Sequence, residues 1–509
     1  MHRCLDIAEL VRLIFEELDP FPCHCAEYDS FLHIDTLLHL AKTCRQFSEP
    51  ALDMLWRSHD GLVNVLKCLP AESWCVSDGY FRIISPVVKL DWQRPLANST
   101  RIKNLCDPDP KILLHTSAVE AIVSLPAGIL LPQVQHIIIE SSAAIFPYIS
   151  GLVGPRIHSI KLTLDLPSLP FSALHPIVPE NRSLNYLSLA RPGLHNDSAK
   201  DLVSAFILEM DNVRELDAQC LNELGYQHIA TFPHLERLRL WDILELPFPC
   251  PPYHDSPFAA LSSVTVHTSD VAFATNFIEV LYSSMLSEVC IISTENATTT
   301  NLAPLFSAIH TACHASQLNH LMISMEEDNT LVAATPNIYT LSMDFLRPLT
   351  VYGSMRSLKL LFPILSGFDD ELMEELAPSW PQLEELFIGG HCRSIELQTS
   401  RRTVNSLISL AHFCPRLDTL SLVIDASRVP LGEYIGITHE QLRTWYPYDS
   451  PVGSPIRTAE YLACLFPCLS ISTRVDKWKE VGDLLLEVQM GERDRSPSPL
   501  LTFDDLKCF

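Results

Sequence analysis

Three potential zinc ligands stand together near the start of the chain, in the stretch Cys23-His24-Cys25. Cysteine and histidine side chains bind zinc, and a structural zinc site needs four such ligands. No second Cys or His pair follows at zinc-finger spacing, and Cys-x-x-Cys does not occur anywhere in the sequence. We therefore expect neither a metal nor another cofactor, and interpret this stretch as part of a loop.

Cys44 is a second candidate for chemistry, because a cysteine thiolate can act as a nucleophile. It lies in the stretch TCRQFSEPALDMLWR, which could be an active-site fragment or a docking surface for another protein. Its spacing to Leu40 and Phe47 places it on the apolar face of a helix. This spacing favours a packed or docking face over a catalytic residue.

The common sequence signatures of catalysis are absent. Neither Gly-Lys nor Gly-x-Gly occurs, which excludes a phosphate-binding P-loop and a dinucleotide-binding fingerprint. Gly-x-Ser-x-Gly and His-Glu-x-x-His are also missing, which removes the usual hydrolase and zinc-protease motifs. The sequence therefore predicts a protein that is not an enzyme.

Composition limits the classes of partner. The chain has 509 residues, 47% of them hydrophobic, and its 61 acidic against 36 Lys and Arg residues give a net charge of −25. Such a charge repels polyanions, and no stretch of the sequence is strongly basic, so we expect no binding to nucleic acid or membranes. Asp6 and Glu9 argue against a signal peptide, and no uncharged apolar run reaches ~18 residues. We expect a soluble protein of the cytoplasm or nucleus.

The first sixty residues predict three short helices. Apolar residues at steps of three and four predict a first helix. A second helix follows it, and a third helix has Pro50 in its first turn. The apolar positions are Ile7, Leu10, Val11, Ile14, Phe15 and Leu18, then Leu37, Leu40, Ala41, Cys44 and Phe47, then Leu52, Leu55 and Trp56. So small a unit needs a partner to complete its apolar faces. That partner is either another protein or the domain behind it.

The order of these residues resembles an F-box, whose pattern LPxEILxxIFxxL, LxxLxxVCRxW and LW is matched at nearly every anchor. Leu5-Asp6 replaces the usual Leu-Pro, and about fourteen extra residues separate the first two helices. The sequence around this motif also resembles that of F-box proteins of the expanded type found in mushroom-forming (basidiomycete) fungi. The resemblance implies docking to the Skp-type adaptor of an SCF (cullin-RING) ubiquitin ligase. The implied adaptor-binding residues are Leu5, Ile7, Leu10, Ile14, Phe15, Leu18, Leu37, Leu40, Cys44, Phe47, Leu55 and Trp56.

The rest of the chain repeats the pattern Leu-x-x-Leu-x-apolar, most clearly in FPHLERLRL, WPQLEELFI and CPRLDTLSL. Eleven steps over 283 residues give a mean spacing near 26 residues, within the range of leucine-rich repeats. The first apolar positions are Val134, Ile157, Leu184, Val213, Leu235, Leu261, Leu286, Leu318, Ile338, Met355, Leu383 and Leu417, and RIKNL at residue 101 is a degenerate earlier start. Helical patterns separate these strands.

We therefore predict an α/β fold, an irregular leucine-rich-repeat solenoid (horseshoe) preceded by a small all-α three-helix F-box. The expected domains are an F-box at 1–60 with a loop insertion at about 20–33, a connecting segment with a degenerate repeat at 61–125, a solenoid at 126–475, and a C-terminal helix and polar tail at 476–509.

Leucine positions form the core, so a binding surface must use the alternate strand residues, which point to the opposite face. The candidates for binding a target are Tyr186, Arg237, Arg239, Trp241, His267, His320, Lys359, Glu385 and Phe387. Their mixed polar and aromatic character suits recognition of a protein. Two hypotheses follow: a substrate-recognition subunit of a ubiquitin ligase, or a repeat scaffold for assembly without ubiquitin transfer.

Overall fold

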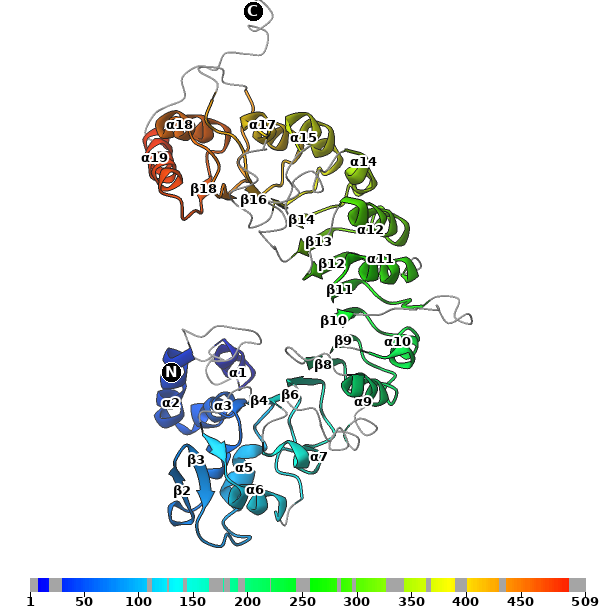
Figure 1. Cartoon of the computed structure of the whole chain (residues 1–509). Coiled ribbons are helices and arrows are strands. Elements are labelled where there is room, and N and C mark those ends of the chain that lie inside the picture. Colours follow the sequence, from blue (N-terminus) through cyan, green and yellow to red (C-terminus); the bar gives the residue numbers. More distant parts are fainter. Residues whose placement is uncertain are drawn as a thin grey trace, which may run out of the picture. The chain divides into compact units, whose positions relative to one another are not determined.

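The computed structural model of the chain describes residues 8–17, 30–107, 112–125, 128–140, 144–163, 177, 184–190, 197–219, 221–243, 257–281, 285–294, 299–325, 343–362, 368–389, 401–429 and 436–493. The chain forms two compact units, Met1–Phe232 and Pro233–Phe509. Within each unit, helices alternate with the strands of a parallel sheet (Figure 1). The predicted α/β class is confirmed.

Unit 1 begins with three helices. They are α1 (Ala8–Glu16), α2 (Ser30–Thr43) and α3 (Arg45–Leu55). Residues 30–33, which the sequence assigned to the inserted loop, form the start of α2. The rest of that loop, including Cys23-His24-Cys25, lies outside the described residues.

The boundary between the second and third helices differs from the prediction. Cys44 has extended backbone angles, φ −157° and ψ 163°, so α2 stops at Thr43. The carbonyl of Cys44 then accepts hydrogen bonds from the N–H groups of Phe47 and Ser48 at 3.2 and 3.0 Å, which begins α3. Phe47 is therefore part of α3 rather than of the second helix. For the same reason Pro50 lies inside α3 and not in its first turn.

In the described residues of unit 1, six parallel strands form the main sheet, in the order of the chain. They are β1 (Ser58–Asp60), β4 (Asn104–Asp107), β6 (His136–Glu140), β7 (Ser159–Thr163), β8 (Tyr186–Ala190) and β9 (Glu215–Gln219). The degenerate repeat predicted at residue 101 is followed by β4, which begins at Asn104. The same described residues also form the helices α4 (Val63–Leu66), α5 (Gln93–Ser99), α6 (Thr116–Val123), α7 (Ile149–Leu152), α9 (Asp197–Ile207) and α10 (Glu223–Ile229).

A second, smaller sheet of unit 1 was not predicted. It contains β2 (Trp74–Ser77), β3 (Tyr80–Ile83) and β5 (Leu113–Leu114). Asp78 and Gly79 join β2 to β3 with φ values of 51° and 77°, as a two-residue hairpin turn requires. The ring of Phe81 is buried against Trp74, with centroids 5.2 Å apart. This pair forms the core beneath the hairpin.

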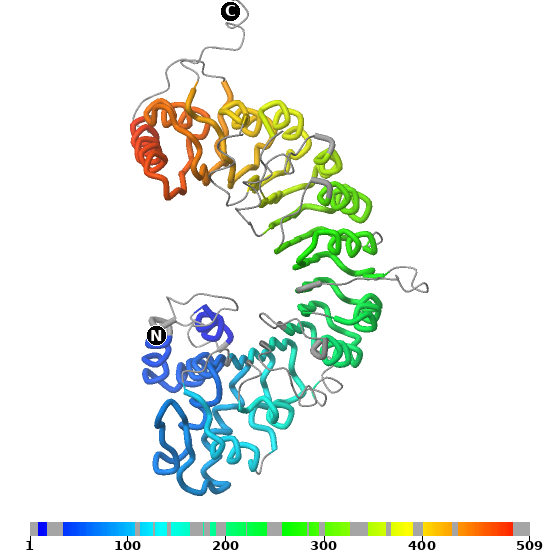
Figure 2. Tube along the Cα trace, in the orientation of Figure 1, coloured from blue at the N-terminus to red at the C-terminus, as the bar shows by residue number. Residues whose placement is uncertain are grey.

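Unit 2 continues the same plan, with nine parallel strands in the part of it that the structure describes. They are β10 (Arg237–Ile243), β11 (Ser263–Thr268), β12 (Glu288–Ser293), β13 (His320–Met325), β14 (Ser357–Leu361), β15 (Glu385–Ile388), β16 (Thr419–Leu422), β17 (Thr444–Tyr446) and β18 (Ser470–Ile471). The helices are α11 (Val271–Val280), α12 (Thr299–Ala312), α14 (Met343–Leu346), α15 (Asp370–Leu376), α17 (Val404–Phe413), α18 (Pro455–Leu465) and α19 (Asp476–Arg493). Successive strands lie side by side along the trace of the unit (Figure 2).

One backbone hydrogen-bond pattern recurs from repeat to repeat. The carbonyl of the residue just before a strand accepts bonds from two consecutive N–H groups at the start of the next strand. In unit 1, Lys103 and Asn104 donate to Arg57, both at 2.9 Å, and in unit 2, Asn319 and His320 donate to Ser287 at 3.0 and 3.1 Å. This recurrence shows that the strands belong to equivalent structural repeats.

The core lies between the strands and the helices on one side of each sheet (Figure 1). In β11 and β12 the burial alternates, so that Val264, Val266, Val289 and Ile291 are buried and their neighbours are not. Those of the predicted first apolar positions that lie in the described residues are also buried, and each lies two residues before a strand. The leucine pattern therefore identified the core correctly.

The repeat predicted at Ile338 lies outside the described residues. On either side of that segment, β13 pairs directly with β14, with His320 opposite Ser357 and Leu321 opposite Leu358. The strand predicted after Met355 is present, because β14 starts two residues after Met355.

Asp370 joins two helices of unit 2, and its loss should destabilise α17. Its carboxylate accepts hydrogen bonds from the N–H and hydroxyl of Thr403, at 2.8 and 2.6 Å, and from those of Ser406, at 3.1 and 2.5 Å. We expect Asp370→Ala to cost about 2 kcal/mol, because it leaves N-terminal donors of α17 without an acceptor. Hydrogen exchange of the α17 amides measures this loss. Asp370→Asn keeps an acceptor and is the control; equal protection in all three proteins would contradict the prediction.

Candidate functional site

The three N-terminal helices have a core of their own. Val11 and Phe15 of α1, Leu37 of α2, and Ala51 and Met54 of α3 are buried together. The partly buried Leu40, Ala41, Phe47 and Leu55 pack around this core, with the rings of Phe15 and Phe47 5.9 Å apart. The face of α1 that carries Val11 and Phe15 is thus buried in this core.

Another face of α1 is apolar and exposed. Leu10, Leu13 and Ile14 keep 38%, 57% and 47% of their surface accessible, and their spacing of three and four residues puts them on one side of the helix. Leu38 of α2 is exposed as well. Clustered large apolar side chains at a surface are typical of a protein-binding site. We call Leu10, Leu13 and Ile14 the α1 apolar face.

Burial divides the predicted adaptor-binding residues into three groups. Leu10 and Ile14 are exposed; Leu40, Cys44, Phe47, Leu55 and Trp56 are partly buried; Phe15 and Leu37 are buried in the core. Leu5, Ile7 and Leu18 lie outside the described residues. The structure therefore leaves Leu10 and Ile14 accessible to a partner and adds Leu13, which the same helical spacing could have identified.

Ionic contacts attach the helices to the rest of unit 1. The Arg101 guanidinium contacts the carboxylates of Glu49, at 2.5 Å, and Asp53, both on α3. Burial acts to lower the pKa of Arg101, but the hydrogen bond and charge of Glu49 and Asp53 outweigh it and raise the pKa. Two further backbone bonds join Arg57, just after α3, to the start of β4. These contacts join α3 and the residues that follow it to Arg101 and to the start of β4.

The target-binding candidates of unit 2 lie on the sheet face opposite the buried leucines. His320 on β13 lies opposite Ser357 on β14, and Ser357 lies opposite Glu385 on β15. Lys359 on β14 lies opposite Phe387 on β15. Arg237, Arg239 and Trp241 stand on β10, and His267 on β11. Tyr186 is partly buried on β8 of unit 1. The period of two residues therefore placed the unit 2 candidates on one surface, which we call the open face.

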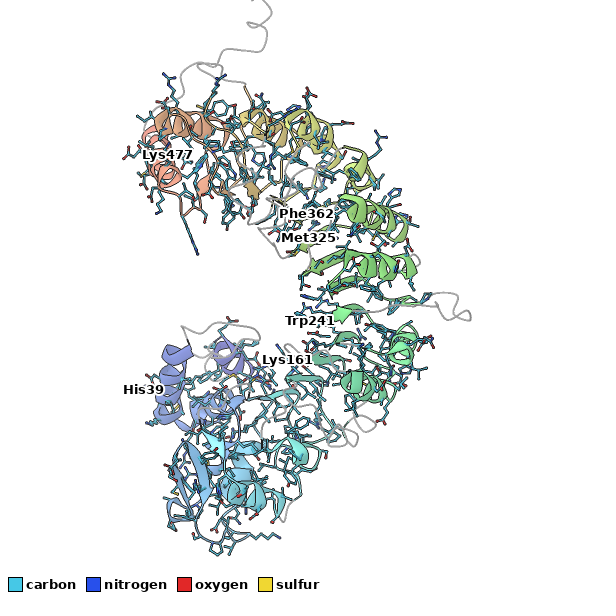
Figure 3. The ribbon with its side chains drawn as sticks, viewed as in Figure 1. His39, Lys161, Trp241, Met325, Phe362 and Lys477 are labelled. Carbon is cyan, nitrogen blue, oxygen red and sulfur yellow. The ribbon has the colours of Figure 1, made fainter. Side chains whose placement is uncertain are left out.

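Several open-face side chains contact one another. Lys359 forms an ion pair with Glu385, with Nζ 2.7 Å from Oε2, and its ammonium lies 4.9 Å from the centre of the Phe387 ring. The Trp241 and His267 rings stack with centroids 3.6 Å apart, and Trp241 is labelled in Figure 3. Such fixed aromatic and charged groups are typical of protein recognition surfaces.

Removing the Lys359 charge should raise the pKa of Glu385. Burial acts to raise this pKa, but hydrogen bonds from Lys359 and Ser357 and the charge of Lys359 outweigh burial and lower it below the ordinary 4.5. The carboxylate therefore stabilises the fold above about pH 4.5, and this contribution is lost as the pH falls through the folded-state pKa. In Lys359→Met we expect a higher Glu385 pKa in an NMR titration of its carboxyl carbon. An unchanged pKa in Lys359→Met but a raised one in Ser357→Ala would assign the effect to Ser357 instead.

A shallow open pocket of about 480 Å³ lies at the start of strands β13 to β16. Its lining alternates in charge and comprises His320, Arg356, Ser357, Glu384, Glu385, Arg416, Asp418 and Gln441. Arg356 approaches Glu384 to 3.9 Å, and Arg443 approaches Asp418 to 3.5 Å. The pocket therefore offers a polar surface of mixed charge next to two of the predicted target-binding residues.

Sequence reasoning missed part of the open face. Tyr446 of β17 lies 6.1 Å from Phe387, ring to ring, and extends the aromatic surface. The three residues Thr444, Trp445 and Tyr446 favour a strand, with Trp445 buried, and this signal could have found β17. In unit 1, Ser188 and Asp217 are buried and hydrogen-bonded at 3.1 Å, so this part of the alternate-residue surface is not open.

Potential metal ligands and thiols occur among the described residues, and three of these thiols have raised pKa values. They hold no cluster of three or more His, Cys, Asp or Glu side chains that could hold a metal. Burial raises the pKa of Cys313 and of Cys414 to about 12. For Cys290, burial together with the charge of Glu288 raises the pKa to about 11, so these three thiols stay protonated at neutral pH. No helix in the described ranges is both long enough and apolar enough to cross a membrane.

Comparisons with known proteins find likeness to solved structures only. No family model matches the sequence, and no curated protein matches it. Chains of solved structures do match, 51 in number. One belongs to the "Crystal structure of Rad7 and Elc1 complex in yeast": it is 11% identical, the match covers 91% of this chain and 87% of that chain, and the TM-score is 0.37. At this identity and TM-score, the likeness carries no argument about partner or function.

Proposed function

We propose that the chain is a substrate-recognition subunit of an SCF (cullin-RING) E3 ubiquitin ligase. Helices α1 to α3 act as an F-box that docks to a Skp-type adaptor, and the open face of unit 2 binds a target protein. The chain performs no covalent step; it holds the target near the ligase, where proximity accelerates ubiquitin transfer. The resemblance of the N-terminal sequence to F-boxes of the fungal type belongs to this proposal.

The observation that carries the proposal is the α1 apolar face. Leu10, Leu13 and Ile14 remain exposed although the three helices already have a closed core. Burying each of these side chains against a partner stabilises the complex by roughly 1.5–3 kcal/mol, part of which lost motional freedom offsets. An exposed apolar helix face on a motif that resembles an F-box is best explained by an adaptor bound there.

The attachment of the helices supports the same function. Arg101 holds α3 through Glu49 and Asp53, and β1 follows α3 almost directly. A receptor must present its target at a defined position relative to the adaptor, and a firmly attached docking motif meets this need. The polar and aromatic open face, with Lys359, Glu385 and Phe387 fixed by mutual contacts, is suited to the target.

Co-purification tests the proposal directly. The full chain, a Skp-type adaptor and a cullin are co-expressed, with a tag on the chain, and the complex is examined by size-exclusion chromatography. We expect a stable assembly of all three proteins. Failure of the unmodified chain to retain the adaptor would refute the proposal. Retention of the adaptor without cullin would favour the alternative function, a repeat scaffold that assembles proteins without ubiquitin transfer.

A further inference from the structure

A cluster of basic side chains lies at one edge of the unit 1 sheet, beside α1. Arg57 and Lys103 occupy equivalent positions just before β1 and β4, because the N–H of Lys103 donates to the carbonyl of Arg57 at 2.9 Å. His136 follows at the start of β6, where its N–H donates to the carbonyl of Lys103 at 3.0 Å. The imidazole of His158 lies 6.5 Å from that of His136. We call Arg57, Lys103, His136 and His158 the basic edge.

Arg57 and Lys103 carry the positive charge of the basic edge at neutral pH. Burial lowers the pKa of Lys103, and the charges of Arg57 and of Arg12 on α1 lower it further, although Glu16 and Asp53 act in the opposite direction. Burial also lowers the pKa of His136 from its ordinary 6.5, with added effects from His158 and Arg57, so this imidazole is neutral at pH 7 and contributes hydrogen bonding rather than charge. A carboxylate close to Arg57 and Lys103 relieves the repulsion between these two cations. Glu16 is itself engaged with Arg12 at 3.4 Å.

Lys161 extends this positive surface onto the sheet. It is exposed on β7, two residues beyond Ser159, which pairs with His136 (Figure 3). Neighbouring strands are about 4.8 Å apart, so the three cations Arg57, Lys103 and Lys161 span a distance that a short extended peptide can follow. The chain has a net charge of −25, so this concentration of basic groups is a local exception.

We propose that the basic edge, together with Lys161, binds an acidic peptide segment of a protein partner, one that carries several Asp or Glu side chains. The net charge of −25 decides between anionic partners. A long polyanion such as nucleic acid, or a charged membrane, would meet the acidic remainder of the chain and be repelled. A short acidic segment contacts only the local cluster. The inference does not depend on the proposed ligase function, because it requires no adaptor.

Fluorescence anisotropy with a short glutamate-rich peptide tests this inference on the full chain, without adaptor. The same peptide with glutamine in place of glutamate is the neutral comparison. We expect the glutamate peptide alone to bind, and its affinity to fall when NaCl is raised from about 0.1 M to about 0.5 M, where screening is stronger. Equal binding of the two peptides would overturn the proposal.

Charge-reversal variants locate the site. We expect Lys103→Glu to weaken peptide binding about tenfold and Lys161→Glu about threefold, since each replaces an attraction by a repulsion. Lys161 is exposed, so its variant remains informative if Lys103→Glu does not fold. Arg457→Glu, an exposed arginine on α18 of unit 2, makes the same change in net charge and should leave binding unchanged. An equal loss in all three variants, or tighter binding of a DNA oligonucleotide or anionic vesicles than of the peptide, would refute the assignment.

Discussion

Replacing Leu10 and Ile14 together by aspartate is expected to abolish binding of the chain to a Skp-type adaptor. Both side chains belong to the α1 apolar face, and the adaptor would have to bury two carboxylates without partners. An unpaired buried charge costs several kcal/mol, so we expect the affinity to fall by more than about 100-fold. Calorimetric titration of purified adaptor into the chain measures the change.

The helices should keep their fold in this variant. Their core is formed by Val11 and Phe15 on a different face of α1, and this face is unchanged. A matched control is the pair Leu224→Asp and Ile456→Asp, which replaces exposed apolar residues of 61% and 57% accessibility outside the three helices. We expect the control to bind the adaptor normally. Normal binding by Leu10→Asp with Ile14→Asp would show that the adaptor does not use the α1 apolar face.

Trp478→Ala is expected to detach α19 from the end of the unit 2 sheet. Trp478 is fully buried, its indole N–H donates to the carbonyl of Ser450 at 2.7 Å, and its ring meets Trp445 edge to face at 4.9 Å. Val481 and Leu485 are buried on the same side of the helix. Removing a buried aromatic ring costs about 3–5 kcal/mol, which is enough to open a terminal helix. Hydrogen exchange should show fast exchange in α19 and β18.

The effect should be local, because repeat proteins are stabilised mainly by contacts between neighbouring repeats. We therefore expect protection in β10 to β13 to stay close to that of the unmodified chain. Trp478→Phe keeps an aromatic ring and loses only the hydrogen bond, so it should retain most of the protection of α19. Protection of α19 that is unchanged in Trp478→Ala would show that Val481 and Leu485 suffice to hold the helix.

The sequence predicted strands correctly where a buried leucine position is followed by residues that alternate between buried and accessible. Leu318 and Leu383 each precede a strand by two residues, and the alternate residues His320 and Glu385 lie on the open face as expected. The repeat predicted at Ile338 lies outside the described residues, whereas β13 pairs directly with β14, 37 residues further along the chain from His320 to Ser357. Pairing between strands is a long-range property that a local window does not contain.

For the three N-terminal helices, too, local spacing predicted some features and not others. Apolar spacing predicted three helices, but it placed Pro50 in the first turn of the third helix and missed the extended backbone at Cys44, after which α3 already begins at Arg45. Spacing also did not separate buried from exposed apolar residues. Val11 and Phe15 turn inward, whereas Leu10 and Ile14 remain accessible, because the directions of α2 and α3 decide which side of α1 is covered.

Composition and periodicity were enough to predict the α/β repeat class, the leucine core and the face that carries polar and aromatic side chains. These properties depend on local spacing, which the order of residues records directly. The basic edge was beyond such reasoning: Arg57, Lys103, His136 and His158 are far apart in the sequence, where no basic cluster exists. Only parallel pairing of β1, β4, β6 and β7 brings them together. The α1 apolar face likewise exists only because the other helices pack against a different side.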